Sequence, residues 1–498
     1  MPHGKIQESV MKDQNYFLKK AEENLPKLYY KEIRPEPQIH DVLVYRGDTL
    51  VLDLGDHAVG TFSFKFDNID DYITAPTRFL IRFAEDKREL EDDFSTYHGT
   101  LADTWLQEEM VIADCPGTVS LPRRYSCRYI KITTVSTRRY IRLSDFLFTA
   151  STSANVEKMI PASIADPMMN RIDKVAAATL RDCMQTFFED GPKRDRRLWI
   201  GDLRLEALTN YYTYNEKDIV KRCLYLFAAG EKNSLGFLPS YIYETPYFFS
   251  GRDNIADYAL LYVVSVCDYF EHTGDRETLD DLIDVCRSQL DSFEKILDDK
   301  LIVKPQPGWF SFIDWCPGIK ALTALMGVYL YTLERFGNLL EKIGASDAKK
   351  YLDLLSIVRA AVRRELYSEQ ERAFVNALDE NQKNVHSQVW MILGGATRGD
   401  EARELLLRYL ADPEARQPFT PYMRHYVTEA MMKLGMRDEA IAFLRKYWGG
   451  MVELGADTFF EVYVPEDPDF SPYKDRMINS LCHAWSCTPA YFIRKYGF

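Results

Sequence analysis

Residues 190–202 have the sequence Asp190-Gly-Pro-Lys-Arg-Asp195-Arg-Arg-Leu-Trp-Ile-Gly-Asp202, with three carboxylates, four basic side chains and a tryptophan. A periodic apolar segment precedes them and ends at Gly191 and Pro192, because proline fixes φ and lacks a backbone donor. A second segment begins near Asp202, whose carboxylate suits a helix N-terminus. The stretch is therefore predicted to connect two helices, a position where catalytic groups are often found. A salt-bridged surface turn is the alternative, and the residues alone favour it.

Apolar residues recur with a helical period over most of the chain after about residue 155. Three long aromatic-rich loops, 235–254, 305–317 and 447–479, interrupt the helices, and loops of this length are usually functional. An even number of paired helices without a sustained repeat predicts either an α-solenoid or a closed (α/α)6 toroid. The predicted helical segments number about twelve and span 163–189, 202–214, 216–230, 254–273, 276–298, 317–343, 346–367, 384–396, 400–411, 421–434, 436–447 and 478–494.

A different pattern of short alternating runs covers residues 41–154. In the run Thr61-Phe-Ser-Phe-Lys-Phe66, phenylalanine occupies every second position, which is the period of a β-strand. We expect an antiparallel β-sandwich that packs against the helices, rather than an independent carbohydrate-binding module. Residues 1–40 are predicted to form an N-terminal extension, and residues 155–498 the helical domain. The predicted strands are 48–54, 59–66, 77–84, 128–135 and 141–150, with an acidic loop at 85–106.

The 498 residues carry a formal net charge of −13, which argues against nucleic acid or an anionic membrane as the partner. The sequence contains no apolar run of about 18 residues and no signal peptide, so no membrane helix is predicted. Nine scattered cysteines form no Cys-x-x-Cys pair, and eight histidines show no metal-ligand spacing. We therefore expect free buried thiols, no metal, no cofactor and a reducing, cytoplasmic location.

The 190–202 stretch resembles the signature of the α-L-rhamnosidases of glycoside hydrolase family 78, Asp-Cys-Pro-x-Arg-Glu followed by Gly-Asp. Asp190, Asp195 and Asp202 match this signature without a gap. The resemblance implies that Asp195 is the general acid, although the family has the longer Glu there. It also implies that Asp190 and Asp202 bind sugar hydroxyls. Arg194 and Trp199 are expected to contact the substrate as well.

A second segment, Gly455-Ala-Asp-Thr-Phe-Phe-Glu461, resembles the family's Gly-Ala-Thr-Thr-x-Trp-Glu, whose Glu is the general base. The resemblance makes Glu461 the base and places Phe460 where the family has Trp. A solvated loop carboxylate is the simpler explanation of Glu461 alone, but two matches in family order favour a glycosidase site. The family inverts configuration, and an inverting enzyme needs its two carboxyl groups about 6.5–9.5 Å apart.

Two more segments resemble the same catalytic domain. Pro307-Gly-Trp-Phe-Ser-Phe-Ile-Asp-Trp315 is similar to its Trp/Asp-Trp loop, and Ser480-Leu-Cys-His483-Ala-Trp485-Ser486 is similar to its Cys-His-x-Trp-Ser segment. Tryptophan can stack on a sugar ring, and a carboxylate can accept from its hydroxyls. A Trp-anchored helix junction and a satisfied core histidine are the alternatives. The further substrate contacts predicted in this way are Asp257, Trp309, Asp314, Trp315, Phe460, His483 and Trp485.

The sequence thus predicts a six-hairpin glycosidase, that is, a β-sandwich followed by an (α/α)6 toroid. Its expected activity is inverting, exo-acting hydrolysis that releases α-L-rhamnose from oligosaccharides or glycosides, with a carbohydrate as partner and homodimerisation left open. The chain ends at Phe498, soon after the His483 segment, which favours a compact intracellular enzyme. Two alternatives remain: a non-catalytic carbohydrate-binding or scaffold protein on the same fold, and a uronyl hydrolase of the same superfamily.

Overall fold

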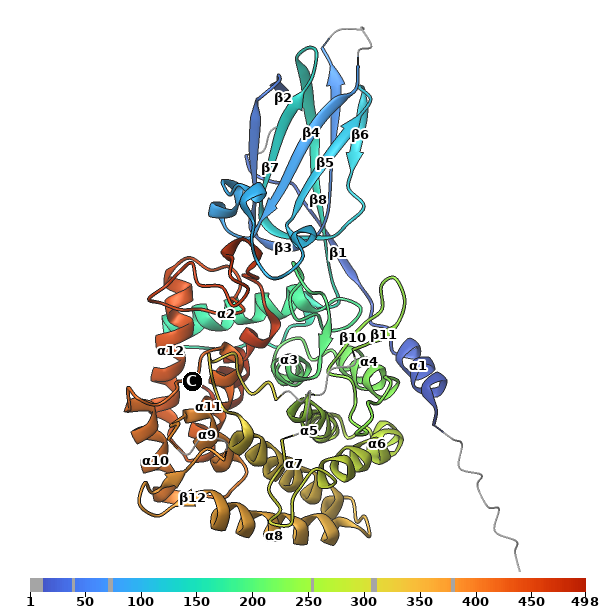
Figure 1. The fold of residues 1–498 in the computed structure, drawn as a ribbon. Helices are drawn as coiled ribbons and strands as arrows, with labels where there is room; N and C mark the ends of the chain where they lie inside the picture. Colours follow the sequence, from blue (N-terminus) through green and yellow to red (C-terminus); the bar gives the residue numbers. More distant parts are fainter. Residues whose placement is uncertain (1–11, 38–40, 70–74, 252–254, 306–310, 378–380) are drawn as a thin grey trace, which may run out of the picture.

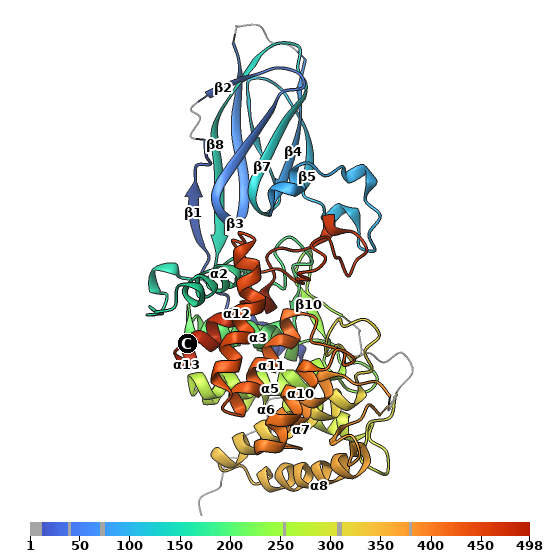
Figure 2. The same cartoon turned by 90° about the vertical axis from the view of Figure 1, so that its left-hand side faces the viewer.

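The computed structural model describes residues 12–37, 41–69, 75–251, 255–305, 311–377 and 381–498. The strands form an elongated domain that stands on a helical domain, beside helix α2 (Pro167–Cys183) (Figures 1 and 2). None of the helices in the described residues is long and apolar enough to cross a bilayer. The nine cysteines are buried and free, as the sequence indicated.

The first domain is an antiparallel sheet folded into two layers, which confirms the predicted β-sandwich. Its pairing order is β1-β8-β3-β7-β4-β5, with β2 on β8 and β6 on β3. In its described residues the strands are β1 (Tyr29–Ile33), β2 (Asp41–Val44), β3 (Thr49–Asn68), β4 (Thr77–Ala84), β5 (Glu108–Ala113), β6 (Gly117–Ser120), β7 (Tyr125–Ser136) and β8 (Ile141–Thr152).

Strand β3 joins the two layers. The prediction of two strands, 48–54 and 59–66, is wrong here, because β3 continues through the intervening residues with a register shift between Asp53 and Ala58. Its first half pairs with β7, and from Gly60 onward it pairs with β8. The predicted alternation is confirmed: Phe62, Phe64 and Phe66 are buried in the core between the layers.

The second domain is a closed ring of helices. Helices α3, α5, α7, α9 and α11 contact one another in this order, and residues 484–487 contact both α11 and α3. This closure confirms the (α/α)6 toroid and excludes an open solenoid. The described helices are α1 (Gln14–Glu23), which packs on α4, then α2, α3 (Ile200–Tyr212), α4 (Lys217–Ala228), α5 (Ala256–Thr273), α6 (Arg276–Glu294), α7 (Leu322–Lys342), α8 (Ala348–Leu366), α9 (Val385–Leu393), α10 (Gly399–Ala411), α11 (Pro421–Lys433), α12 (Arg437–Glu453) and α13 (Pro489–Tyr496).

The connection from α2 to α3 is longer than predicted. Helix α2 ends at Cys183 rather than near residue 189, because Met184 leaves the helical conformation and pairs with Phe188 in a β-bridge. The chain then crosses the end of the toroid as an irregular segment and forms strand β9 (Leu198–Trp199). The early end of α2 leaves residues 190–197 outside the helix at this end of the ring, where 190–194 are buried and 195–197 are partly exposed.

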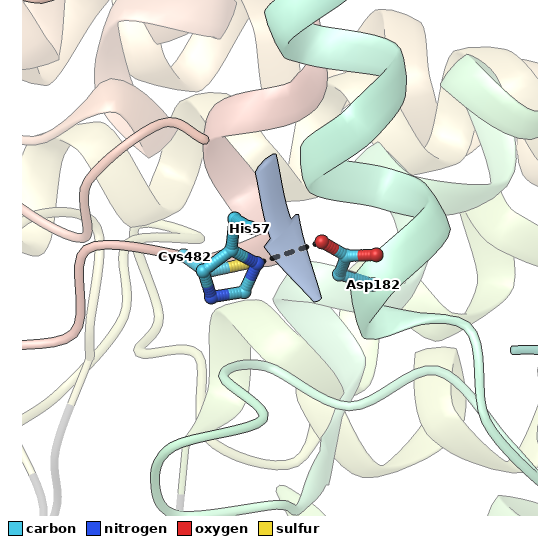
Figure 3. A group of neighbouring side chains, drawn as sticks. All are labelled: His57, Asp182 and Cys482. Atoms are coloured by element: carbon cyan, nitrogen blue, oxygen red, sulfur yellow. Dashed lines mark hydrogen bonds and ion pairs between the residues drawn. The ribbon is translucent and has the colours of Figure 1, made fainter. Parts of the chain in front are cut away.

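A buried ion pair joins the two domains (Figure 3). His57 Nδ1, from β3, lies 2.7 Å from Asp182 Oδ2 on α2, with Cys482 beside the ring. Its other nitrogen, Nε2, lies 3.0 Å from Ser126 Oγ and 3.5 Å from Glu85 Oε1. Burial opposes the charged imidazole, but Cys482 and the two carboxylates outweigh it and raise its pKa well above 6.5.

His, Asp and Cys together form a donor set that a metal can use. Here both nitrogens of His57 already have partners, and Arg181 donates to both oxygens of Asp182 over 2.6 and 2.9 Å. The contacts of this cluster are therefore those of an ion pair between domains.

Replacing His57 by Gln is expected to lower the free energy of unfolding by about 3 kcal/mol, because it breaks the buried ion pair with Asp182 and removes one positive partner of Glu85. The folded-state pKa of His57 is raised, so its contribution is full below about pH 6.5 and declines as the pH rises through the folded-state pKa. Urea unfolding is the measurement. Lys65→Gln is the control on the same strand, β3. It removes an exposed ion pair with Asp145 of β8 and should cost at most about 1 kcal/mol. Equal losses of stability in His57→Gln and Lys65→Gln would contradict the assignment of His57 to a buried ion pair.

Candidate active site

The candidate site lies where three connections meet: residues 184–199, residues 311–321 and residues 454–488. Strand β9 pairs with β10 (Tyr241–Tyr243), which pairs with β11 (Phe249–Ser250), and this small sheet fixes one side of the site. Residues 311–321 contact residues 484–487, which close the ring, through Phe312 and Trp315 against Trp485. The fold therefore brings the two predicted motifs, more than 250 residues apart in sequence, into one place.

Glu461 is a buried carboxylate bound by two side chains. Its carboxylate forms a bidentate pair with Arg194, with Nη1 3.3 Å from Oε1 and Nη2 bonded to Oε2. Tyr473 donates from its hydroxyl to Oε1 over 2.7 Å, and its ring lies 4.2 Å from the Arg194 guanidinium. Only 3% of Glu461 is exposed. A bidentate guanidinium and a hydroxyl group together fix the orientation of this carboxylate.

The backbone around Glu461 is equally fixed. Its N–H donates to the Ser480 carbonyl over 3.0 Å, and its carbonyl accepts from Trp485 Nε1 over 2.9 Å. Arg194 also donates from Nε to the Ile478 carbonyl. Arg194 was predicted to contact the substrate, but its donors engage protein groups, so its geometry is that of a residue that positions Glu461.

Asp195 occupies a different environment. Its side chain is 19% exposed and lines a cavity of about 770 Å³ between the two domains. Burial raises the pKa of this carboxyl, Arg194 and Arg197 oppose the rise, and the charge of Glu461 adds to it. A carboxyl group with a raised pKa at the mouth of a cavity can donate a proton, as a general acid must.

Three further carboxyl groups, those of Asp190, Asp202 and Glu206, lie near Asp195 and Glu461. Burial and the charge of Asp195 raise the pKa of Asp190 to about 8, and its Oδ1 accepts from the Arg197 N–H over 3.0 Å. Burial raises the pKa of Asp202 well above 3.8, and that of Glu206, one helical turn later on α3, well above 4.5. Among the described residues, Asp202 Oδ1 and both Glu206 oxygens have no hydrogen-bond partner. Buried polar atoms normally have partners, so this group is suited to receive hydroxyl groups of a ligand.

An aromatic wall faces these carboxyl groups. The Trp485 ring stacks on Phe312 with centroids 5.7 Å apart and stands perpendicular to Trp315 at 5.5 Å. His483 lies 4.3 Å from Trp485, and its Nε2 is 3.6 Å from Glu461 Oε1. Burial and Arg194 lower the pKa of His483 well below 6.5, so its ring is neutral. Trp199 packs on Tyr241 with ring centroids 4.6 Å apart.

The strand domain supports the site through its acidic loop. Glu85 accepts the N–H of Leu481 over 2.6 Å, and Glu89 pairs with Lys193 at 2.7 Å. The loop contains the short 3-10 helices η1 (Lys87–Leu90), η2 (Phe94–Thr96) and η3 (Asp103–Trp105). These contacts tie the strand domain to the 190–202 motif and to the segment around His483.

The comparisons with known proteins agree with this geometry. Residues 18–150 match the model of the glycosyl hydrolase family 78 alpha-rhamnosidase N-terminal domain. Residues 162–496 match that of the bacterial alpha-L-rhamnosidase 6 hairpin glycosidase domain. The chain belongs to glycoside hydrolase family 78. It is a glycoside hydrolase of the six-hairpin class, as the sequence predicted.

Solved structures of family 78 enzymes resemble this glycosidase over most of its length. A rhamnosidase from Klebsiella oxytoca with rhamnose bound is 35% identical, with a TM-score of 0.92, and the match covers 97% of this chain and 99% of that one. A family 78 rhamnosidase of Bacillus sp. GL1 is 23% identical (TM-score 0.77), and the match covers 92% of this chain and 47% of that one. The Streptomyces avermitilis alpha-L-rhamnosidase complexed with L-rhamnose is 16% identical (TM-score 0.69), with 94% and 44% covered. The glycosidase thus spans about half the length of the last two. A comparison with curated proteins found no match.

Two predicted substrate contacts of the glycosidase have other partners. Asp257 accepts the backbone N–H groups of Phe312 and Ile313, each over 3.0 Å, and burial raises its pKa to about 6. Asp314 is enclosed: Oδ2 accepts from His386 Nε2, and Oδ1 from the Thr420 hydroxyl. Both carboxylates hold the aromatic loop in place, and Asp314 also lines a cavity with Trp315 and Tyr473. Contact of Asp257 and Asp314 with a sugar stays a prediction.

Phe460 and Trp309 are the two remaining aromatic predictions. The Phe460 ring packs near Tyr463, against the cluster that contains Trp448. Its contact with a substrate stays a prediction. Trp309 lies outside the described residues.

Tyr473 was missed by the sequence analysis. Only its place in the aromatic-rich loop 447–479 pointed to it, because no motif spacing links it to Glu461. Replacing Tyr473 by Phe removes the hydrogen bond to Glu461 and is expected to lower kcat of the glycosidase about 10-fold or more. Tyr97→Phe is the matched control, because its hydroxyl donates to the Leu101 carbonyl in the strand domain. Steady-state kinetics check the prediction, and an unchanged kcat for Tyr473→Phe would contradict it.

Replacing Asp190 by Asn is expected to reduce the pH dependence of stability. The raised pKa of Asp190 means that the folded protein keeps a proton that the unfolded chain releases near pH 3.8. Its contribution is full below the unfolded pKa and declines as the pH rises to about 8. Between about pH 5 and about pH 8, the wild type should lose about 1–3 kcal/mol more stability than the variant in urea unfolding. Equal losses of stability in the wild type and in Asp190→Asn over this pH range would contradict a raised pKa of Asp190 in the folded protein.

Proposed function

We propose that this glycosidase is an inverting, exo-acting hydrolase that releases α-L-rhamnose from oligosaccharides or glycosides. The observation that carries the proposal is the contrast between its two motif carboxyl groups. Asp195 has a raised pKa and lines a cavity, whereas Glu461 is buried and bound by Arg194 and Tyr473. Two carboxyl groups in opposite environments are the arrangement that acid–base hydrolysis of a glycoside requires.

In the proposed reaction, Asp195 donates its proton to the glycosidic oxygen as the bond from that oxygen to the anomeric carbon breaks. Glu461 removes a proton from a water molecule that attacks the anomeric carbon from the opposite face. Attack from that face inverts the configuration. The sugar leaves with the water oxygen, Glu461 releases its proton to solvent, and Asp195 is reprotonated from solvent. Arg194 and Tyr473 hold the Glu461 carboxylate toward the water throughout.

The surroundings suit a terminal 6-deoxy sugar. Asp190, Asp202 and His483 offer polar atoms to its hydroxyl groups. Trp315 and Trp485 present apolar faces that can cover a ring face or a methyl group. The rhamnose bound in the Klebsiella oxytoca relative supports the choice of sugar.

Turnover of 4-nitrophenyl α-L-rhamnopyranoside tests the proposal. We expect hydrolysis of this glycoside with a kcat/KM at least about 10-fold above those for 4-nitrophenyl α-L-arabinofuranoside and β-D-glucopyranoside. Hydrolysis of one of the other glycosides without turnover of the rhamnoside would overturn the sugar assignment. No turnover of any glycoside would favour the carbohydrate-binding alternative.

A further inference from the structure

The cavity beside Asp195 lies where a leaving group must be. A general acid protonates the oxygen between the departing sugar and the rest of the substrate, so the space next to the acid on its open side receives that remainder. This cavity of about 770 Å³ has walls from both domains, including Trp105 of the strand domain and Tyr243 of the catalytic domain. Its size is within the usual range for small-molecule sites, and its aromatic side chains offer a surface for a pyranose ring.

The lining of this cavity is unusually basic for a chain whose net charge is −13. Four arginines line it: Arg123 and Arg124 from the strand domain, and Arg196 and Arg197 from the motif segment. They come from different elements and converge on the same space. Guanidinium groups are the side chains that bind carboxylates and phosphates with fixed geometry.

Two of these four arginines already have carboxylate partners: Arg124 pairs with Glu189 of the same lining, and Arg123 Nε lies 3.0 Å from Glu109 Oε1. Arg222 binds Glu244, because its Nη2 lies 2.6 Å from each oxygen of the Glu244 carboxylate. Glu189 pairs with Arg124 at 2.6 Å. Asp195 is the third lining carboxyl group, and it must carry a proton to act as the acid.

Arg196 has no carboxylate within ion-pair distance among the residues that the structure describes. Its Nε donates to the Pro192 carbonyl and its Nη2 to the Arg124 carbonyl, each over 2.7 Å. Burial lowers its pKa to about 10; Glu189 opposes this, and Arg124 and Arg123 add to it. Arg197 lies 3.8 Å from Asp195 Oδ2, so protonation of Asp195 removes its nearest counter-charge.

We propose that this cavity is a leaving-group subsite selective for substrates that carry a carboxylate there, that is, rhamnosides of a uronic acid. The inference rests on the proposed function. The carboxylate of the leaving group supplies the anion that Arg196 and Arg197 lack when Asp195 is protonated.

Substrate binding then supports the acid as well. The charge of Arg197 opposes protonation of Asp195, so a bound carboxylate that neutralises Arg197 favours the protonated acid. The proton of Asp195 passes to the glycosidic oxygen, and the uronic acid leaves with a hydroxyl group at that position. We therefore expect a larger kcat/KM for the uronide than for a neutral substrate. The high-pH limb of the pH profile of kcat/KM should also lie at a higher pH for the uronide.

The test compares three substrates of the full-length protein: α-L-rhamnosyl-(1→4)-D-glucuronate, α-L-rhamnosyl-(1→4)-D-glucose and 4-nitrophenyl α-L-rhamnopyranoside. The first two differ only by a carboxylate in place of a hydroxymethyl group. We expect kcat/KM for the uronide to exceed that for the neutral disaccharide about 10-fold or more at low salt, with the ratio falling as salt screens the pair. Arg197→Gln should reduce this ratio, and the exposed Arg276→Gln on α6 should leave it unchanged.

The outcomes separate the two claims. Turnover of 4-nitrophenyl α-L-rhamnopyranoside with equal or lower kcat/KM for the uronide than for the neutral disaccharide would overturn the subsite while leaving the proposed function intact. Absence of turnover with all three substrates would overturn the proposed function and the subsite with it. A wild-type ratio that does not change with salt would also contradict the subsite, even if Arg197→Gln does not fold.

Discussion

Replacing Asp195 by Asn lowers kcat/KM for an unactivated alkyl α-L-rhamnoside by about 10²–10⁴-fold in this account. Asn keeps the size of the side chain but cannot donate the proton that the leaving oxygen needs. A nitrophenolate leaves without full protonation, so the loss for 4-nitrophenyl α-L-rhamnopyranoside should be smaller. The raised pKa of Asp195 sets the high-pH limb of the wild-type profile, because activity falls as the acid deprotonates, and the variant should lack that limb.

Steady-state kinetics of both substrates across pH check this prediction. Asp353→Asn is the matched control, because Asp353 is an exposed carboxylate on α8 that pairs with Lys349. Equal losses for the alkyl and the nitrophenyl substrate would mean that Asp195 does not act as the acid. An unchanged rate would remove it from the site.

Replacing Glu461 by Gln is expected to reduce kcat by about 10²–10⁴-fold for both substrates alike, because the water then lacks its base whatever the leaving group. The same change leaves Arg194 buried without a counter-charge and should destabilise the fold. A double variant, Glu461→Gln with Arg194→Met, removes both charges. It should recover part of the stability but none of the activity.

Kinetics and urea unfolding of the single and double variants separate the two effects. Glu453→Gln, an exposed carboxylate at the end of α12, is the control. Little loss of activity in Glu461→Gln would favour the uronyl hydrolase alternative, which works with one Asp and does not need this residue.

Local patterns predicted much of this molecule. The every-second phenylalanines of β3 form the sandwich core because a strand turns alternate side chains to one face. The helical period of the apolar residues and the short turns predicted the paired helices of the toroid. The two motifs predicted that Asp195 and Glu461 lie at one site, since each has fixed spacing within a short segment.

Contacts between distant segments could not be predicted in this way. The continuous β3 depends on its pairing with both β7 and β8, and neither partner is visible in the spacing of residues 49–68. Asp257 and Asp314 have the residue type of a sugar ligand, but their partners come from other loops. Tyr473 contacts Glu461 only because the loop that carries it folds back over Arg194.

The stereochemistry of the first product tests the central claim most directly. Proton NMR of 4-nitrophenyl α-L-rhamnopyranoside hydrolysis, recorded before the free sugar mutarotates, identifies which anomer of rhamnose is formed first. If Asp195 protonates the leaving oxygen and Glu461 activates water on the opposite face, β-L-rhamnose appears first and the α-anomer follows. Initial release of α-L-rhamnose would contradict single displacement by this pair of carboxyl groups.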